Sequence, residues 1–155
     1  MKKIYRGFAA CLCVVTIIGL SGCFYKKKTD SESFRAAAEA KGYEIQDVTD
    51  RFDPEVGVSK CYYVRIPEEN FELAFYAVET QTQAKAMCDQ NKKKFENFAG
   101  GATGETTGSG NNVKYSLTAE GRYMVNSSIG NTFIYADVPE EKAEDVKAVL
   151  NELGY

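Results

Sequence analysis

Two cysteines in the middle of the chain, Cys61 and Cys88, could form a disulfide that links distant segments. In an oxidising compartment such a bond would stabilise the fold by restricting the unfolded chain. The alternative is two separate thiols, because Tyr62 and Val64 form the core face of an expected strand and place Cys61 on its other face. Cys88 lies on the apolar stripe of an expected helix, so the two thiols would point apart. Two cysteines without histidine or a CxxC spacing make a poor zinc set, so we expect no metal site.

Tyrosines on the expected strands could line a ligand surface, because their rings are apolar and their hydroxyls form hydrogen bonds. The candidates are Tyr62, Tyr63, Tyr76, Tyr115 and Tyr123. The alternative is that these rings belong to the core and only their hydroxyls reach water. No pair of carboxylates stands out for hydrolysis, so the sequence assigns no catalytic residue.

The composition excludes several classes of function. The chain contains no histidine and no tryptophan. Without histidine, Ser-His-Asp and Cys-His catalysis is impossible, and the commonest metal ligand is missing. The formal net charge of −3 argues against a nucleic-acid partner, which would require a basic surface. We also expect no bound cofactor.

Residues 1–22 have the pattern of a secretory signal. Lys2, Lys3 and Arg6 form a basic head, and an apolar run over residues 8–20 follows it. This segment contains three basic and no acidic residues, so its removal lowers the formal net charge of the chain from −3 to −6.

The segment Leu20-Ser21-Gly22-Cys23 resembles the lipobox of bacterial lipoprotein signal peptides. The resemblance implies that the Cys23 thiol receives a diacylglyceryl group, with acyl chains such as palmitate, and that cleavage makes Cys23 the first residue. Two acyl chains anchor a protein stably, because each buried CH₂ contributes roughly 0.8 kcal/mol. The alternative is an uncleaved membrane helix, because residues 7–25 carry no charge.

After the signal we expect a lipidated tether over residues 23–29 and a single domain over residues 30–155, which is long enough for one core. The globular part resembles no characterised family. Apolar periodicity and turn residues predict helices and strands in alternation. The expected helices cover residues 33–41, about 82–99 and about 139–153, and each carries an apolar core stripe, which in the second helix includes Phe98. The expected strands cover 43–49, 58–66, 71–78, 113–119, 122–127 and 132–136, and the second and third of them form the strongest hairpin signal. Residues 102–112 read as a mobile, glycine-rich connector.

The element order is therefore α-βββ-α-βββ-α. Short turns between consecutive strands favour an antiparallel sheet, and helices packed on one face would complete a two-layer α+β sandwich. From the signal and the missing catalytic groups we expect an extracytoplasmic, non-enzymatic binding domain, held at the membrane of the cell envelope by lipid on Cys23. Its partner would be an envelope protein or a small ligand. The alternative is an envelope hydrolase that uses carboxylates or tyrosine.

Overall fold

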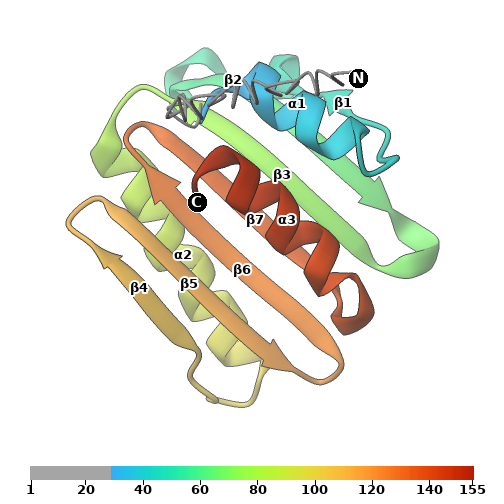
Figure 1. Ribbon diagram of the computed structural model, residues 1–155. Coiled ribbons are helices and arrows are strands. Elements are labelled where there is room, and N and C mark those ends of the chain that lie inside the picture. Colours follow the sequence, from blue (N-terminus) through green and yellow to red (C-terminus); the bar gives the residue numbers. More distant parts are fainter. Residues whose placement is uncertain (1–28) are drawn as a thin grey trace, which may run out of the picture.

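The computed structural model describes residues 29–155, so Cys23 and the expected signal segment lie outside the described residues. Three α-helices and a seven-stranded antiparallel sheet confirm the α+β class for this part of the chain (Figure 1). The helices are α1 (Ser31–Glu39), α2 (Gln81–Phe98) and α3 (Ala143–Leu153). The strands are β1 (Gln46–Asp47), β2 (Val58–Ile66), β3 (Phe71–Val78), β4 (Glu105–Ser109), β5 (Asn112–Ala119), β6 (Arg122–Ile129) and β7 (Thr132–Pro139).

The sheet has the strand order β1-β2-β3-β7-β6-β5-β4, and each pair of neighbours is antiparallel. The expected hairpin of β2 and β3 is confirmed, with Pro67–Glu69 forming a short 3₁₀ turn between them. Asn70 ends this turn in the left-handed conformation, which asparagine tolerates better than most residues. The two halves of the chain meet where β3 pairs with β7.

The helices cover both faces of the sheet, which corrects the expected two-layer arrangement. In Figure 1, α1 and α3 lie in front of the sheet and α2 lies behind it. The physical reason is that the central strands are apolar on both sides. On β7, Ile134 packs in the cluster of α1 and α3, whereas the adjacent Phe133 packs with residues of α2. A second apolar face needs its own cover, and α2 supplies it.

The stripes expected on α1 and α3 are confirmed as buried. Asp30 caps α1 by accepting a hydrogen bond from Ser33 N, and Phe34 stacks on Phe75 of β3 with ring centroids 5.4 Å apart. The buried side chains are Phe34, Ala37 and Ala38 on α1 and Ala143, Val146, Val149, Leu150 and Leu153 on α3. These side chains join one apolar cluster with β2, β3, β6 and β7.

Helix α2 follows the expected stripe along most of its length. Thr80 caps it through Gln83 N, and Ala84, Cys88 and Phe95 are buried. The expectation that Phe98 belongs to the core is wrong, because its side chain is 55% exposed. The last turn of the helix therefore presents an aromatic ring to solvent.

The glycine-rich stretch contains a strand, which corrects the expected connector. Strand β4 pairs with β5 and forms one edge of the sheet. Gly108 has φ +92°, and a Cβ there would lie 2.2 Å from the carbonyl oxygen of Asn112, so the close approach of the two strands requires glycine. All five residues of β4 are exposed, so no apolar alternation marks the strand in the sequence.

Candidate binding groove beside helix α2

Charged and aromatic side chains form two rows on the sheet face that carries α2. Arg65, Glu72 and Asp137 occupy directly neighbouring positions on β2, β3 and β7. In the next row, Tyr63 and Tyr135 lie on either side of Ala74. Because side chains two positions apart share one face of a sheet, both rows lie on the same side.

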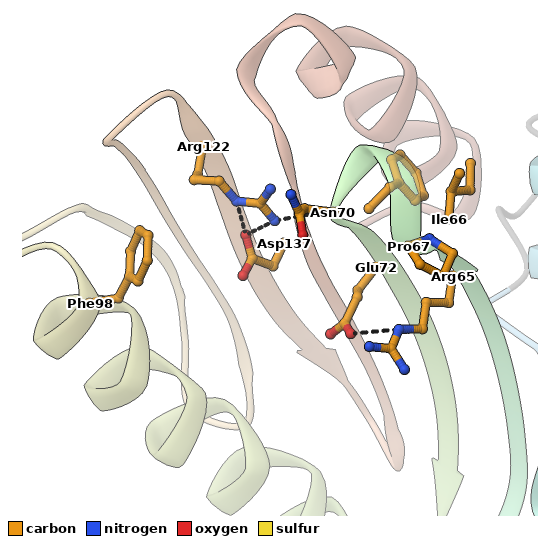
Figure 2. A pocket seen from close by; sticks show the side chains of 9 residues that line it. Arg65, Ile66, Pro67, Asn70, Glu72, Phe98, Arg122 and Asp137 are labelled. Carbon is orange, nitrogen blue, oxygen red and sulfur yellow. Dashed lines mark hydrogen bonds and ion pairs between the residues drawn. The ribbon is translucent and has the colours of Figure 1, made fainter.

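The charged row borders a cavity of about 420 Å³, which we call the arginine groove. Strands β2, β3, β6 and β7, the 3₁₀ turn and the end of α2 all contribute to it (Figure 2). Its lining residues are Arg65, Ile66, Pro67, Asn70, Phe71, Glu72, Phe98, Arg122 and Asp137. Elements from both halves of the chain therefore build the site.

The inner ion pair of the arginine groove joins Arg122 to Asp137. The Arg122 guanidinium donates from Nε at 2.8 Å and from Nη2 at 2.6 Å to Oδ1 of Asp137. Nη2 also donates to the carbonyl oxygen of Asn70 at 2.6 Å. The side chains of Arg122 and Asp137 are only 18% and 28% exposed, so the pair is weakly screened by solvent. Figure 2 shows these contacts at the centre of the groove.

Burial raises the pKa of the Asp137 carboxyl above its usual value, because a charged group loses hydration in this position. The hydrogen bonds and the charge of Arg122 act in the opposite direction, and the neighbouring Glu72 raises the pKa further. Arg122 thus offsets part of the rise in the pKa of Asp137 that burial causes.

The outer ion pair joins Arg65 to Glu72, with 3.5 Å between Nε and Oε1. The Arg65 side chain is 59% exposed, so most of its N–H groups remain accessible to a ligand. Together the two pairs give the groove two cations and two anions, with no net formal charge. Such a lining favours a ligand that presents polar groups of both signs.

Phe98 lines the arginine groove, whereas Tyr63 and Tyr135 lie in the next row of the sheet, outside the lining. Phe98 stands on the opposite side of the groove from Arg65 (Figure 2). Burial, followed by the adjacent Glu72, raises the pKa of Tyr63 to about 12. Burial also raises the pKa of Tyr135, with Asp137 adding to the shift. Both hydroxyls are therefore protonated at neutral pH and are able to donate hydrogen bonds.

The structure does not bring the five candidate tyrosines into one surface. Tyr62 and Tyr123 face the cluster of α1 and α3 and are buried, and the Tyr62 hydroxyl donates to Glu32 at 2.8 Å. Tyr115 is buried under α2. Tyr63 and Tyr76 are half-buried on the α2 side of the sheet, and only Tyr63 lies in a row next to the charged groups.

Cys61 and Cys88 are both buried and both free. The expectation that the two thiols point apart needs correction, because it assumed that helices cover only one face of the sheet. Tyr76 lies beside Cys61 on the neighbouring strand and also packs against the cluster that contains Cys88, so both thiols are on the α2 side. Burial raises the pKa of each thiol to about 12, which keeps both protonated and unreactive.

Sequence reasoning missed Phe98, Arg122 and Asp137 as members of a site. A signal existed for Asp137, which is the one charged residue in an otherwise apolar stretch, Phe133–Val138. Its alternation places it on the same side as the aromatic Phe133 and Tyr135. Arg122 directly follows a turn at Glu120-Gly121 and carries no pattern that identifies a partner.

The described residues contain no cluster of ligands able to hold a metal ion. Between residues 29 and 155, no helix combines the length and the apolar character needed to cross a membrane. The arginine groove contains no thiol or hydroxyl nucleophile among its lining residues. The groups that its lining offers are two arginine–carboxylate ion pairs, a backbone carbonyl that already accepts from Arg122, and the exposed ring of Phe98.

Comparison with protein-family models finds no match for this chain, and comparison with curated proteins finds none. Among solved structures, the chain is similar to the extracellular domain of PknH from Mycobacterium tuberculosis, with 13% identity and a TM-score of 0.38. The alignment covers 80% of this chain and 91% of that chain. A likeness with so low a TM-score carries no conclusion about what this chain does or where it acts.

Proposed function

We propose that the protein is an extracytoplasmic, membrane-anchored binding domain that holds a protein or peptide partner in the arginine groove. The observation that carries the proposal is the position of an exposed Phe98 beside two arginine–carboxylate pairs. Aromatic and arginine side chains are enriched at the centres of protein interfaces, because they combine apolar area with directional hydrogen bonds.

The shape of the groove supports a partner with an extended contact. The site spans four strands, one turn and the end of a helix. Its charges are paired before binding, so a partner does not have to neutralise an isolated buried charge. Arg65 and Phe98 are the most accessible of its functional side chains, and we assign them the first contacts with the partner.

The proposed anchor is the lipid on Cys23. Support comes from the lipobox resemblance of residues 20–23 and from the basic head before them. Helix α1 begins at Ser31, so few residues separate Cys23 from the folded domain. At roughly 3.3–3.6 Å per residue, this tether would keep the groove within a few tens of ångströms of the membrane.

One observation favours the alternative of a hydrolase. Glu72 and Asp137 are neighbours across β3 and β7, and the pKa of Asp137 is raised. However, each carboxylate is held by an arginine, and a general acid or base must be free to exchange its proton with a substrate. The geometry therefore supports recognition better than catalysis. Detection of a catalytic turnover that is lost in Glu72→Gln would favour the hydrolase over the binding domain.

Site-specific photocrosslinking tests the binding function in the full chain. Replacing Phe98 by p-benzoylphenylalanine should give a reproducible crosslink in the native envelope, and adding Arg65→Glu should abolish it. The same replacement at Glu152, which is exposed on α3 at the other sheet face, is the matched control and should not crosslink. Equal crosslinking at both positions, or a crosslink insensitive to Arg65→Glu, would contradict the proposal.

A separate experiment tests the anchor. Cys23→Ala should abolish both acyl labelling and cleavage of the signal, because the thiol is the acceptor of the lipid. Cys13→Ala, within the apolar run, should leave both unchanged. If Cys23→Ala matures and remains membrane-bound as before, the lipoprotein interpretation is wrong and the membrane-helix alternative replaces it.

A further inference from the structure

The apolar contact between α2 and the sheet is divided into two clusters. Near the start of the helix, Ala84 and Cys88 pack with Val78 and Phe133. Near its end, Phe95 packs in a separate cluster with Tyr115, Leu117 and Met124. The gap between the two clusters lies over the middle of β6.

The side chain in this gap is Asn126. It lies between Tyr135 and Tyr115 in the register of β7, β6 and β5, on the face that carries α2. Its relative exposure is 0%, and neither Nδ2 nor Oδ1 has a hydrogen-bond partner among residues 29–155. Burying an amide without partners is costly, so an apolar residue of similar size would be the more stable choice for packing alone.

Asn126 lines a cavity of about 170 Å³ that runs between α2 and the strands β4 and β5. The helix contributes Lys85, Cys88, Asp89 and Lys92, and the strands contribute Thr106, Val113, Lys114, Tyr115 and Asn126. At the outer end, Lys85 pairs with Asp89 at 2.6 Å, and Lys92 Nζ lies 4.9 Å from the centre of the Tyr115 ring. The arginine groove and this cavity share no lining residue.

The chemistry of the cavity defines what would fit. Asn126 presents one amide donor and one carbonyl acceptor side by side, and their complement is another group with an acceptor and a donor side by side. The apolar part of the wall, with Cys88, Val113 and Tyr115, suits the short apolar remainder of the occupant.

Three lysines and one aspartate line the cavity. Lys85 pairs with Asp89 and Lys92 with Glu96, and burial lowers the pKa of the third lysine, Lys114. A neutral occupant leaves these contacts intact. A volume of this size equals that of roughly five or six water molecules, which limits the occupant to a small molecule.

We propose that this cavity is a second binding site, which takes a small uncharged molecule with a carboxamide-type edge through paired hydrogen bonds to Asn126. The site is independent of the arginine groove, because the two cavities share no lining residue. Asn126 is thus a binding residue whose side chain is retained at a cost in stability. The occupant receives two hydrogen bonds in a water-poor position, where such bonds discriminate strongly between ligands.

Ligand-observed NMR on the detergent-solubilised full chain tests this site with two matched probes. Propionamide carries the donor–acceptor edge, and 2-butanone has nearly the same shape without an N–H donor. We expect saturable binding of propionamide in the millimolar range, because a ligand with so few atoms can gain only a small binding free energy. Binding of 2-butanone should be roughly tenfold weaker or more.

Two variants at one position remove the amide in different ways. Asn126→Leu fills part of the cavity, and Asn126→Ala keeps the space but has no amide, so it cannot fail through overpacking. Both should lose propionamide binding by roughly tenfold or more, with the urea midpoint reporting whether each is folded. Thr132→Ala is the control, because Thr132 is a buried polar residue of β7 whose hydroxyl contacts Ile129 and Tyr155, and neither of these lines the cavity. It should bind propionamide as the unmodified chain does.

Two outcomes would overturn the proposal. The first is equal signals for propionamide and 2-butanone, which would mean that the amide edge is not recognised. The second is unchanged propionamide binding in folded Asn126→Ala, which would mean that the molecule binds elsewhere or that only water hydrates Asn126. Binding that is selective for propionamide and dependent on Asn126 supports the site.

Discussion

Arg122 on β6 donates two hydrogen bonds to the same oxygen of Asp137 on β7 and a third to the carbonyl oxygen of Asn70. These contacts tie two adjacent strands to the turn that ends the β2–β3 hairpin. Because β3 pairs with β7 at the junction of the two halves, one side chain links the halves at this end of the sheet. The same three residues line the arginine groove, so this ion pair both joins the strands and borders the proposed binding site.

Replacing Arg122 by methionine should destabilise the fold by about 1–3 kcal/mol, because Asp137 would keep its burial and lose its charged partner. The difference in the free energy of unfolding between the variant and the unmodified chain should become smaller as the pH falls. The pKa of Asp137 is already raised by burial, so without Arg122 this group gains a proton more readily and its charge no longer has to be buried. Urea unfolding at pH 7 and at pH 4.5 measures both effects.

The control for this prediction is Arg65→Met in the outer pair of the same groove. Its partner Glu72 is 35% exposed and Arg65 itself is 59% exposed, so solvent screens the interaction. We expect a change of at most about 0.5 kcal/mol. Equal destabilisation by the two substitutions would contradict the role assigned to burial.

Asp47 should titrate far below an ordinary aspartate. A hydrogen bond from Lys60 at 2.6 Å, followed by those from the Thr49 side chain and backbone, lowers its pKa from 3.8 to about 2. Because the folded pKa is lowered, the stabilising contribution is present above pH 3.8 and is lost as the pH falls toward 2. Carboxyl-detected NMR titration measures the pKa directly.

Lys60→Met is the matched variant for the Asp47 titration. Removing the Lys60 hydrogen bond should raise the pKa of Asp47 part of the way toward 3.8, while the two Thr49 hydrogen bonds keep it below that value. An unchanged titration in Lys60→Met would show that the lysine does not control this carboxylate.

Both internal thiols should be inert in the folded protein. Cys61 and Cys88 are 1% and 3% exposed, and burial raises each pKa to about 12. At pH 8 a thiol reagent should therefore label neither residue until denaturant is added, and both should react afterwards. Mass spectrometry of the unreduced protein should show no link between the two peptides. A Cys61–Cys88 cross-linked peptide would contradict the prediction.

Gly108→Ala should detach strand β4 from the sheet. A Cβ at this position would meet the Asn112 carbonyl oxygen at 2.2 Å, in addition to the cost of a left-handed conformation, roughly 1–2 kcal/mol. Because β4 lies at the edge of the sheet formed by residues 29–155 and has β5 as its one neighbour there, we expect fraying of this edge without global unfolding. Faster amide exchange in β4, with protection kept in β3 and β7, would show this.

Gly110→Ala tests whether the backbone clash matters. Gly110 also has a positive φ, +62°, but a Cβ there would meet nothing within 4 Å. The substitution carries only the conformational cost, so exchange in β4 should change less than in Gly108→Ala. Identical effects would show that the left-handed conformation alone decides the outcome.

Local patterns predicted much of the secondary structure. The β2–β3 hairpin and the stripes of α1 and α3 are confirmed, because each has a strong periodicity of its own and a turn or cap residue at its end. Strand β4 had no such signal. Its residues are exposed on both sides, and pairing with β5 through backbone hydrogen bonds holds it in place.

The position of α2 could not be predicted in the same way. Its apolar stripe showed which side of the helix is buried but not which face of the sheet receives it. Alternation on β7 is consistent with either face, because Phe133 and Ile134 are both buried. Choosing one face for all three helices also led to the wrong reason for separating Cys61 from Cys88.

The sequence by itself determined the α+β class, most element boundaries and the function classes that lack of histidine excludes. Those properties depend on composition and on neighbours within a few residues. Only the tertiary structure decided that Arg122 meets Asp137, that Phe98 stands beside them, and that Asn126 is buried without a partner. Strand order and the face chosen by α2 set these relationships, and both depend on how distant segments share one core.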